Sequence, residues 1–567
     1  MNLKKLVAIA AFCLPVLALS AQTKAPESWF TLDPAKDNVN GTGGDEALKR
    51  LKEKGKKGET VIVAVLDSGV EIDHEDLKDV IWTNPNEIPG NGKDDDNNGY
   101  IDDIHGWNFL GGKDGKNILH ESLELTREYT RLSKRFKDTD PKKLSAENKK
   151  EYDYYLKVKE DFETQRADAE KDIEANLKGI KKVEDAFAQV EKALGKKEVT
   201  PDEVNSIKTE GNAELTAAVE LLKRMAAQGI TSRKDIEEAK KEVSEGGALK
   251  YMLNPDYNPR DIVGDDPYDT TNRFYGNNDY EGPDAFHGTH VAGIIAANRN
   301  NNVGIRGVAD NVKIMTVRCV PDGDERDKDV ANAIYYAVDN GASIINMSFG
   351  KGYSPQKEYV DAAMRYAAEH DVLLVHAAGN SAQNNDETGN FPNDNYEKAV
   401  KKGLFKKEKN VPTWMEIGAL HYRTNEKRVA GFSNYGKKNV DLFSPGVQLY
   451  STVPDGKYGN ASGTSMASPA AAGVAAIIRS YYPELSAMQV KKIMEKSVVK
   501  QDGEVTKPGS TDKVKFTELC VTGGTISATN AVELAEKTKA AKKPKKAIWR
   551  DAGGGKLKKN LAKEPRA

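Results

Sequence analysis

Short apolar runs alternate with helical patterns along this chain, and that alternation narrows the possible folds more than any other feature. Four runs rich in Val, Ile and Ala lie at residues 61–66, 313–317, 342–347 and 372–377. Runs of this kind are typical of strands buried on both faces of a parallel sheet. Helical patterns lie between them at residues 329–339 and 357–370. We therefore predict an α/β fold with a doubly wound parallel sheet.

Four polar residues stand at the borders of these predicted elements. Asp67 and Asn380 each lie where an apolar run ends. His287 and Ser465 are each followed by a helix-like stretch rich in Ala and Gly. Active sites of doubly wound folds gather at the carboxyl ends of the strands, so we expect these side chains to meet there.

Three short motifs surround the acid, the imidazole and the hydroxyl among these residues. Asp67 lies in Val-Leu-Asp-Ser-Gly-Val, His287 opens His-Gly-Thr-His-Val-Ala-Gly, and Ser465 is central in Gly-Thr-Ser-Met-Ala-Ser-Pro. An acid, an imidazole and a hydroxyl together can form an activated serine nucleophile. Each residue also has a plainer interpretation when taken alone. Asp67 could be an aspartate of a turn, His287 could be a metal ligand together with His290, and Ser465 could be a helix N-cap. No Glu completes a His-Glu-x-x-His pattern at His287.

The wording and order of these motifs resemble those of the subtilisin-like serine proteases, the subtilases. The resemblance extends from about residue 29 to residue 535 and is broken by a long insertion. It implies that Asp67 orients His287, that His287 is the general base, and that Ser465 is the nucleophile. It also implies that Asn380 and the Ser465 N–H group hold the oxyanion. The resemblance thus predicts an endopeptidase that acts on proteins or peptides and needs no cofactor for catalysis.

The same resemblance assigns two segments to substrate binding. An extended peptide is expected to lie along Ser348, Phe349 and Gly350, with main-chain pairing that gives affinity but little selectivity. Ala377, Ala378 and Gly379 are expected to line the primary pocket and to leave it open. The alternative for both segments is ordinary core packing.

An acidic loop follows the first motif at residues 94–103. Asp94, Asp96, Asn98 and Asp102 fit positions one, three, five and nine of a calcium-binding loop. His105 stands where such a loop places a bidentate glutamate, so a complete EF-hand is not expected. We predict a structural calcium ion held by this partial loop. The alternative is a cluster of Asx turns without a metal.

The N-terminal 21 residues have the pattern of a secretory signal peptide. Lys4 and Lys5 precede an apolar run from Leu6 to Leu19, which is short for a membrane span. The alternative is a permanent membrane anchor. A signal peptide predicts a secreted or periplasmic protein without stable membrane insertion after cleavage. Cys319 and Cys520 would then remain, either as a disulfide or as two buried thiols.

Residues 117–258 differ from the rest of the chain because they are densely charged and poor in Gly and Pro. Apolar residues recur there every three or four positions, which predicts three to five amphipathic helices paired as antiparallel hairpins. Thr200 to Glu203 has the form of a capping box. This all-helical insertion is either a solvated spacer or a gate, a substrate clamp or a partner surface.

The sequence therefore divides into five parts. They are a signal peptide (1–21), a first catalytic part with a short lead-in (22–116), the helical insertion (117–258), a second catalytic part (259–536) and a flexible basic tail (537–567). Charges are balanced, with a net charge of -3, which argues against nucleic acid as a partner. Two alternatives to the protease remain: a catalytically silent binding or scaffold protein on the same fold, and an acyl transferase using the same residues.

Overall fold

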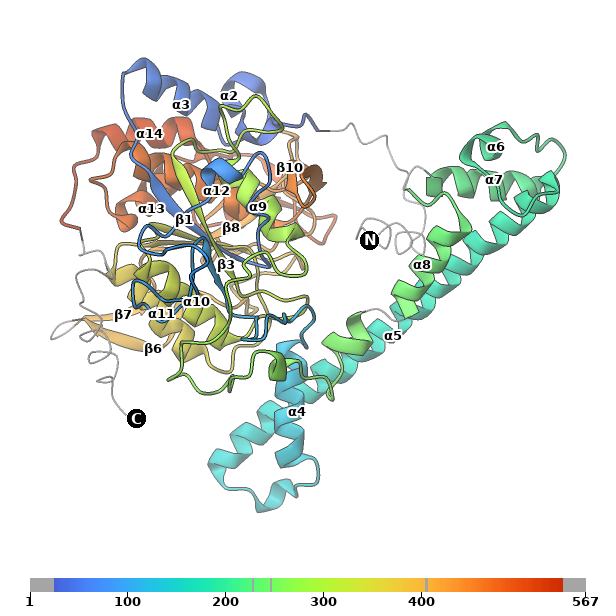
Figure 1. Ribbon diagram of the computed structural model, residues 1–567, viewed down its shortest axis with the longest axis horizontal. Coiled ribbons are helices and arrows are strands. Elements are labelled where there is room, and N and C mark those ends of the chain that lie inside the picture. Colours follow the sequence, from blue (N-terminus) through green and yellow to red (C-terminus); the bar gives the residue numbers. More distant parts are fainter. Residues whose placement is uncertain (1–24, 227–228, 245–246, 403–405, 544–567) are drawn as a thin grey trace. The chain divides into compact units, whose positions relative to one another are not determined.

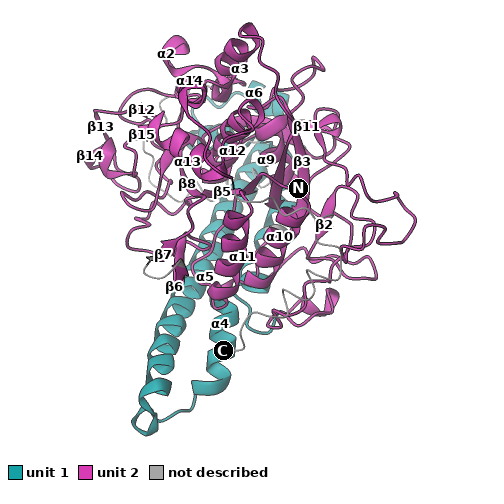
Figure 2. Ribbon diagram, turned by 90° about the vertical axis from the view of Figure 1, so that its left-hand side faces the viewer, with its two compact units in different colours: residues 1–23, 125–257 teal, residues 24–124, 258–567 magenta. Residues whose placement is uncertain are grey.

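The computed structural model describes residues 25–226, 229–244, 247–402 and 406–543. The predicted signal peptide and the tail beyond residue 543 lie outside the described residues. The chain forms two compact units, one of which comprises residues 125–257 (Figure 2). The other is built from the chain on both sides of that segment. The sequence prediction placed the segment at 117–258, slightly wider at both ends.

A mostly parallel sheet forms the centre of the larger unit. Within the described residues it has nine strands in the order β12-β15-β9-β8-β5-β4-β1-β3-β2, and only the β12–β15 pair is antiparallel. The strands are β1 (Val61–Asp67), β2 (Gly106–Asn108), β3 (Val312–Arg318), β4 (Ile344–Met347), β5 (Leu373–Ala377), β8 (Trp414–Leu420), β9 (Leu442–Pro445), β12 (Val499–Lys500) and β15 (Gly524–Thr525).

Helices cover both faces of this sheet (Figure 1). On one face pack α3 (Gly44–Glu53), α9 (Phe286–Ala296), α12 (Thr464–Tyr481), α13 (Ala487–Lys496) and α14 (Ala528–Lys537). On the other face pack α10 (Asp327–Asp339) and α11 (Lys357–Glu369). Along β1, Val63 and Val65 belong to the first layer, whereas Ala64 and Leu66 belong to the second. The predicted doubly wound α/β fold is confirmed.

Shorter elements complete this unit. They are η1 (Trp29–Thr31), α2 (Pro34–Asp37), η2 (Lys78–Val80), η5 (Arg260–Ile262), β6 (Asn395–Lys402), β7 (Lys406–Asn410), β10 (Leu449–Val453), β11 (Lys457–Ala461), β13 (Glu504–Thr506), β14 (Lys513–Lys515) and η6 (Phe516–Glu518).

The Ala-rich helix α12 is buried along almost its whole length. Small side chains such as Ala470, Ala471 and Ala472 let it pack closely against the sheet and against α9. Its first turn holds Ser465, so close packing of this helix fixes the position of the candidate nucleophile.

The smaller unit is all-helical. Its described elements are α4 (Glu124–Phe136, whose first residue belongs to the larger unit), η3 (Pro141–Lys143), α5 (Ala146–Leu194), α6 (Pro201–Ser206), α7 (Ala213–Ala226), α8 (Arg233–Ser244) and the π-helical turn η4 (Ala248–Met252). The predicted capping box is present, because the side chains of Thr200 and Glu203 each accept a hydrogen bond from the other residue's N–H group. The apolar faces of α5, α6, α7 and α8 enclose a separate hydrophobic cluster.

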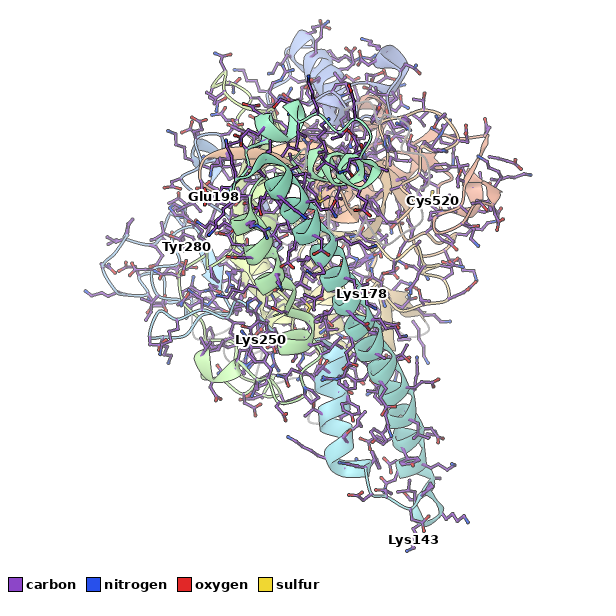
Figure 3. All side chains as sticks on the ribbon, turned by 90° about the vertical axis from the view of Figure 1, so that its right-hand side faces the viewer. Lys143, Lys178, Glu198, Lys250, Tyr280 and Cys520 are labelled. Atoms are coloured by element: carbon purple, nitrogen blue, oxygen red, sulfur yellow. The ribbon has the colours of Figure 1, made fainter. Side chains whose placement is uncertain are left out.

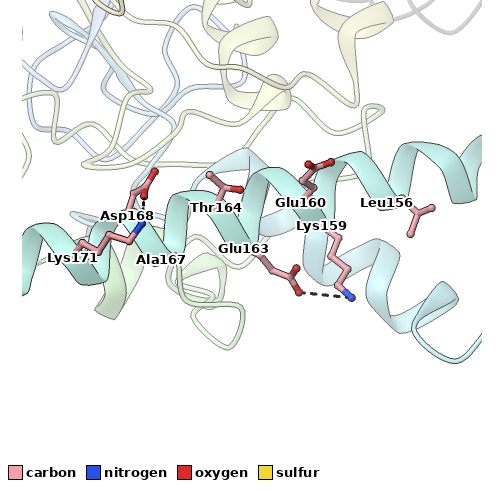
Figure 4. Close-up of a pocket in the computed structure, with 8 residues that line it drawn as sticks. All are labelled: Leu156, Lys159, Glu160, Glu163, Thr164, Ala167, Asp168 and Lys171. Carbon is pink, nitrogen blue, oxygen red and sulfur yellow. Dashed lines mark hydrogen bonds and ion pairs between the residues drawn. The ribbon is translucent and has the colours of Figure 1, made fainter.

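The exposed residues of the long helix α5 are mostly Lys, Glu and Asp, among them Lys178, which is labelled in Figure 3. A shallow depression on it is lined mainly by charged residues that pair along the helix, as Lys159 does with Glu163 and Lys171 with Asp168 (Figure 4). Exposed pairs of this kind contribute only about 0.3–0.5 kcal/mol each to helix stability. These pairs therefore contribute little to the stability of the unit.

Buried ion pairs hold the two chain segments that lead into and out of the helical unit. Glu124 pairs with Lys351 at 2.7 Å, and Lys351 pairs with Asp327 at 2.9 Å. Arg260 donates two hydrogen bonds of 2.8 Å to the carboxylate of Asp329. All these side chains are buried, and both clusters lie at the start of α10. The larger unit thus fixes both ends of the insertion.

The two cysteines that the structure describes are unpaired. Cys319 and Cys520 are both buried, in two different hydrophobic clusters. Burial raises the pKa of both thiols. Of the two sequence alternatives, this arrangement corresponds to buried thiols.

We expect Arg260→Met to lower the free energy of unfolding by about 3–5 kcal/mol. The reason is that the variant leaves the carboxylates of Asp265 and Asp329 buried without the guanidinium that faces both. Urea denaturation followed by intrinsic fluorescence measures the change.

Lys437→Met is the matched control, because the Lys437–Glu518 pair is exposed in the same unit and should contribute at most about 1 kcal/mol. Equal effects of the two substitutions would contradict the assigned role of Arg260.

Candidate active site

Asp67 ends strand β1 and is almost fully buried. Its Oδ1 accepts hydrogen bonds from the backbone N–H of Ser68 at 2.8 Å and from His287 Nδ1 at 2.7 Å. Its backbone carbonyl accepts a bond of 3.0 Å from the N–H of Cys319, just past β3. The carboxylate is therefore held in one orientation, directed at the imidazole.

His287 lies in the first turn of α9 and is partly exposed to solvent. The next residue must be glycine for helix and strand to approach so closely. A Cβ atom on Gly288 would lie 2.1 Å from the carbonyl oxygen of Gly69 and 3.1 Å from Asp67 Cβ. The Asp67–His287 bond leaves His287 Nε2 as the ring nitrogen available for another partner.

The charge around His287 favours its protonated form. Desolvation of the ring acts to lower its pKa, but the nearby Asp67 carboxylate and, more weakly, Asp284 outweigh that effect. The net result is a pKa of His287 above its ordinary value of 6.5. An imidazolium formed during a reaction would be stabilised in the same way.

Ser465 is the second residue of α12. Its hydroxyl donates a hydrogen bond of 3.0 Å to the carbonyl oxygen of Ser348, and the hydroxyl of Ser348 donates one of 2.9 Å to the carbonyl oxygen of Ser465. Ser465 and His287 share no hydrogen bond among the described contacts. In this structure the serine hydroxyl is directed toward the end of β4.

Sheet register places this serine beside the Asp67 end of the sheet. Met347 of β4 is paired with Leu66 of β1, so Ser348 lies next to Asp67 on the adjacent strand. Neighbouring strands are about 4.8 Å apart. The two hydrogen bonds between Ser348 and Ser465 therefore bring the start of α12 to the same edge of the sheet as Asp67 and His287.

Asn380 is fixed against the first turn of α12. Its Oδ1 accepts hydrogen bonds from the N–H and the hydroxyl of Thr464, at 2.8 and 3.0 Å. A Cβ atom on Gly463 would lie 3.4 Å from Asn380 Nδ2 and 3.5 Å from the backbone nitrogen of Ser465. Two N–H groups thus flank one small space beside Ser465, and only glycine leaves that space open.

The two predicted substrate segments follow neighbouring strands. Met347 of β4 is paired with His376 of β5, so residues 348–350 and 377–379 lie side by side at the ends of these strands. Phe349 is half-buried and Gly350 is exposed, whereas Ala377 and Ala378 are buried. Of these residues, Gly350 is exposed, Gly379 is half-buried, and the two alanines belong to the core.

The predicted calcium ligands do not all converge. Asp94 accepts hydrogen bonds from the N–H groups of Asn98 and Gly99, and Asp102 accepts them from three loop N–H groups. The side chain of Asn98 donates to Asp103. Only Asp96 of the four predicted ligands belongs to a convergent acidic group.

That convergent group consists of Glu87, Asp96 and Asp103, whose carboxylate oxygens lie within 4.8 Å of one another. Oε1 of Glu87 accepts hydrogen bonds from two loop N–H groups. Its Oε2 is buried without a hydrogen-bond partner among the described residues. An unpaired buried carboxylate oxygen beside two other carboxylates fits a hard cation with oxygen ligands. The calcium-loop pattern did not select Glu87 or Asp103, because neither occupies one of its ligand positions.

Comparison with known proteins gives the same family that the motifs suggested. The model of the subtilase family matches residues 58–519, which is most of the chain. The chain belongs to the subtilase family. Its α/β unit accordingly has the subtilisin-like fold, with the helical unit inserted between the strand of Asp67 and the helix of His287.

Individual subtilases are similar over about a third of this chain. The thermophilic serine proteinase of Bacillus sp. (strain AK1) is 39% identical over 206 residues, which are 36% of this chain and 45% of that protein. Subtilisin DY of Bacillus licheniformis is 36% identical over 209 residues, 36% of this chain and 67% of that protein. The major intracellular serine protease of Bacillus subtilis (strain 168) is also 36% identical, over 57% of its length. The chain thus spans about half to two thirds of these relatives.

We expect the pKa of His287, measured by NMR titration, to lie above 6.5 and to fall in the Asp284→Asn variant. Asp284 is an exposed carboxylate whose negative charge stabilises the imidazolium, and asparagine removes that charge but keeps the oxygen that accepts from Phe286 N–H. The His287 signal is assigned by its disappearance in His287→Gln.

Glu358→Gln serves as the control, because it removes an exposed charge on α11. A titration midpoint that stays the same in Asp284→Asn, or that falls equally in both variants, would contradict the proposed electrostatics.

Proposed function

We propose that this chain is an exported serine endopeptidase that hydrolyses peptide bonds through Asp67, His287 and Ser465. The Asp67–His287 hydrogen bond of 2.7 Å is the observation that carries the proposal. It fixes the tautomer in which Nδ1 bears the proton, so that Nε2 is free to act as a base. Membership of the subtilase family supports the same activity.

In the first step the Ser465 hydroxyl turns from the Ser348 carbonyl oxygen toward His287 and attacks the peptide carbonyl carbon. A looser arrangement before substrate binds is common in such sites. As the Oγ–C bond forms, the hydroxyl proton passes to Nε2 of His287. Asp67 stabilises the resulting imidazolium.

The negative oxygen formed in this step would occupy the space beside Gly463. The Asn380 side-chain N–H and the Ser465 backbone N–H flank that space and would both donate to the oxyanion. When the carbon–nitrogen bond breaks, His287 gives its proton to the leaving amine. Water then attacks the acyl-enzyme, with His287 again as base, and restores the free Ser465 hydroxyl.

Export is the second part of the proposal, and it depends on the signal-peptide pattern of residues 1–21. Family membership alone does not decide location, since the relatives include a protease named as intracellular. Within the part of the chain that the structure describes, none of the helices combines the length and the apolar character that a membrane span requires.

We expect wild-type protein to cleave denatured casein and to react with a fluorophosphonate at Ser465. Ser465→Ala should lower kcat by about 10⁶-fold, because the nucleophile is lost. Asn380→Ala should lower kcat by about 10²- to 10³-fold, because one oxyanion donor is lost. Progress curves and mass spectrometry of the labelled peptide measure these effects.

Ser462→Ala is the matched control: this exposed serine lies three residues before Ser465 and accepts a hydrogen bond from the N–H of Gln448. It should keep full activity. Equal cleavage by wild type and Ser465→Ala would exclude the mechanism, whereas correct folding without cleavage or labelling would favour the silent scaffold.

We also propose that the loop after β1 binds calcium as a structural ion, with Glu87, Asp96 and Asp103 as its acidic ligands. The support is the convergence of their three carboxylates and the buried, unpartnered Oε2 of Glu87. Bound calcium would supply the positive charge that this buried acidic group needs. Asp103 is also joined to α10 by a hydrogen bond of 2.7 Å from Tyr336, so the ion would tie the loop to the core.

Calcium should raise the thermal unfolding midpoint of the wild-type protein, because an ion that binds the folded state stabilises it. Glu87→Gln should abolish this shift. Asp94→Asn should keep it, since the Asp94 carboxylate is used by backbone N–H groups. Differential scanning calorimetry with calcium, magnesium or chelator tests both. Loss of the shift in Asp94→Asn but not in Glu87→Gln would instead support the ligands expected from the loop pattern.

A further inference from the structure

A buried carboxylate lies behind the segment that carries Asn380. Glu416 stands in the middle of β8, an otherwise apolar and buried strand, and is only 3% exposed. A buried carboxylate costs free energy unless other groups replace its water, so an apolar residue would serve better if this strand only had to pack. The charge therefore indicates a role beyond packing.

Four side chains donate hydrogen bonds to this carboxylate. Its Oε2 accepts from Trp414 Nε1 at 3.1 Å and from His376 Nδ1 at 2.9 Å. Its Oε1 accepts from Asn385 Nδ2 at 3.2 Å and from Asn390 Nδ2 at 3.4 Å. The ring of His376 is fully buried and packs against Trp414. Both oxygens of the carboxylate are thus held in place by buried or half-buried neighbours.

The carboxamide of Asn385 transmits the orientation of Glu416 to Asn434. A carboxylate only accepts hydrogen bonds, so Asn385 has to turn its Nδ2 toward Glu416. The same Nδ2 also donates to the carbonyl oxygen of Ala378 at 2.9 Å. Asn385 Oδ1 then points the other way and accepts a bond of 3.0 Å from Asn434 Nδ2. The negative charge therefore decides which way both carboxamides face.

Asn434 in turn holds the residues on both sides of Asn380. Its Oδ1 accepts hydrogen bonds from the backbone N–H groups of Ser381 and Gln383, at 2.9 and 3.0 Å. Its own backbone N–H donates to the carbonyl oxygen of Gly379 at 2.8 Å. The line of hydrogen bonds that starts at the buried carboxylate therefore ends at the backbone from which the Asn380 side chain projects.

We infer that Glu416 is a positioning residue for the oxyanion donor Asn380 and acts on it through Asn385 and Asn434. The inference rests on the proposed endopeptidase function. An oxyanion donor is effective only where the negative charge develops, and a displacement of about 1 Å can cost about 10²-fold in rate. Glutamine at position 416 would have the same shape but could present either an N–H or an oxygen to Asn385, so it would no longer impose one orientation.

Glu416→Gln should lower kcat by about tenfold and change KM by less than about twofold, because the oxyanion exists only in the reacting state. Asn385→Ala, which interrupts the same line of hydrogen bonds, should act in the same way. The substrate is the one that wild-type protein hydrolyses fastest among succinyl-Ala-Ala-Pro-X-p-nitroanilides with Ala, Leu or Phe as X. Complete labelling with a fluorophosphonate counts the active molecules, so that misfolded protein does not enter kcat.

A double-mutant cycle separates positioning from general damage. In the Asn380→Ala background the side chain to be positioned is absent, so Glu416→Gln should lower kcat further by less than about twofold. Asp371→Asn is the matched control, because it neutralises a buried carboxylate that is paired with Arg479 at 3.2 Å. Asp371 precedes β5, at the opposite edge of the sheet from Asn380, and its substitution should leave kcat per active molecule unchanged.

An unchanged kcat in Glu416→Gln and Asn385→Ala would overturn the inference. An equal loss of kcat with and without the Asn380 side chain would also overturn it, and both results would leave the protease proposal intact. Should one of the two variants fail to fold, the other carries the same comparison. A wild type that cleaves none of the peptides and does not react with fluorophosphonate would remove the proposed function, and this inference with it.

Discussion

The parallel pairing of β1 with β3 is the interaction on which the rest of this structure depends. Seven residue pairs align the two strands, from Val61 with Val312 to Asp67 with Arg318. The pairing joins the chain before the helical insertion to the chain after it. The helix α9, which precedes β3, packs in the same layer as both strands, and its first turn lies at the end of β1, where His287 is hydrogen-bonded to Asp67. On the other side of β1, β4 brings Ser348 to the same edge, where it holds the start of α12.

Close backbone approach is the second requirement of the site. Gly288 lets α9 come near enough to Gly69 for the imidazole to meet the carboxylate, and Gly463 keeps a small space open between two N–H groups. Both glycines lie within the motifs, next to the functional residues. Both leave volume unfilled beside Asp67, His287 and Ser465, where the proposed reaction would take place. At Gly350, by contrast, the Asn390 side chain takes up the volume that a Cβ atom would need, and at Gly379 the Asn434 side chain does so.

The sequence alone predicted an element correctly wherever the residue pattern of that element is continuous and local. The strands β1, β3, β4 and β5 were predicted to within two residues because each is an unbroken apolar run. The strand β8 was not recognised, because Glu416 interrupts its apolar character, and its burial depends on partners that are remote in sequence. Glu87 was not selected from the sequence for the same reason, since it is the fold that brings the carboxylates of Asp96 and Asp103 near it. The helix α5 is continuous from Ala146 to Leu194; its first half packs against α4, and its second half packs against α7 and α8.

The helical unit encloses its own hydrophobic cluster, whose residues all lie between Ile173 and Val243. The α/β unit anchors the segments on either side of the insertion, because Glu124 and Arg260 form ion pairs with other side chains of that unit. A change of sequence or length within residues 173–243 therefore falls on a hydrophobic interior that is separate from the two layers beside the sheet.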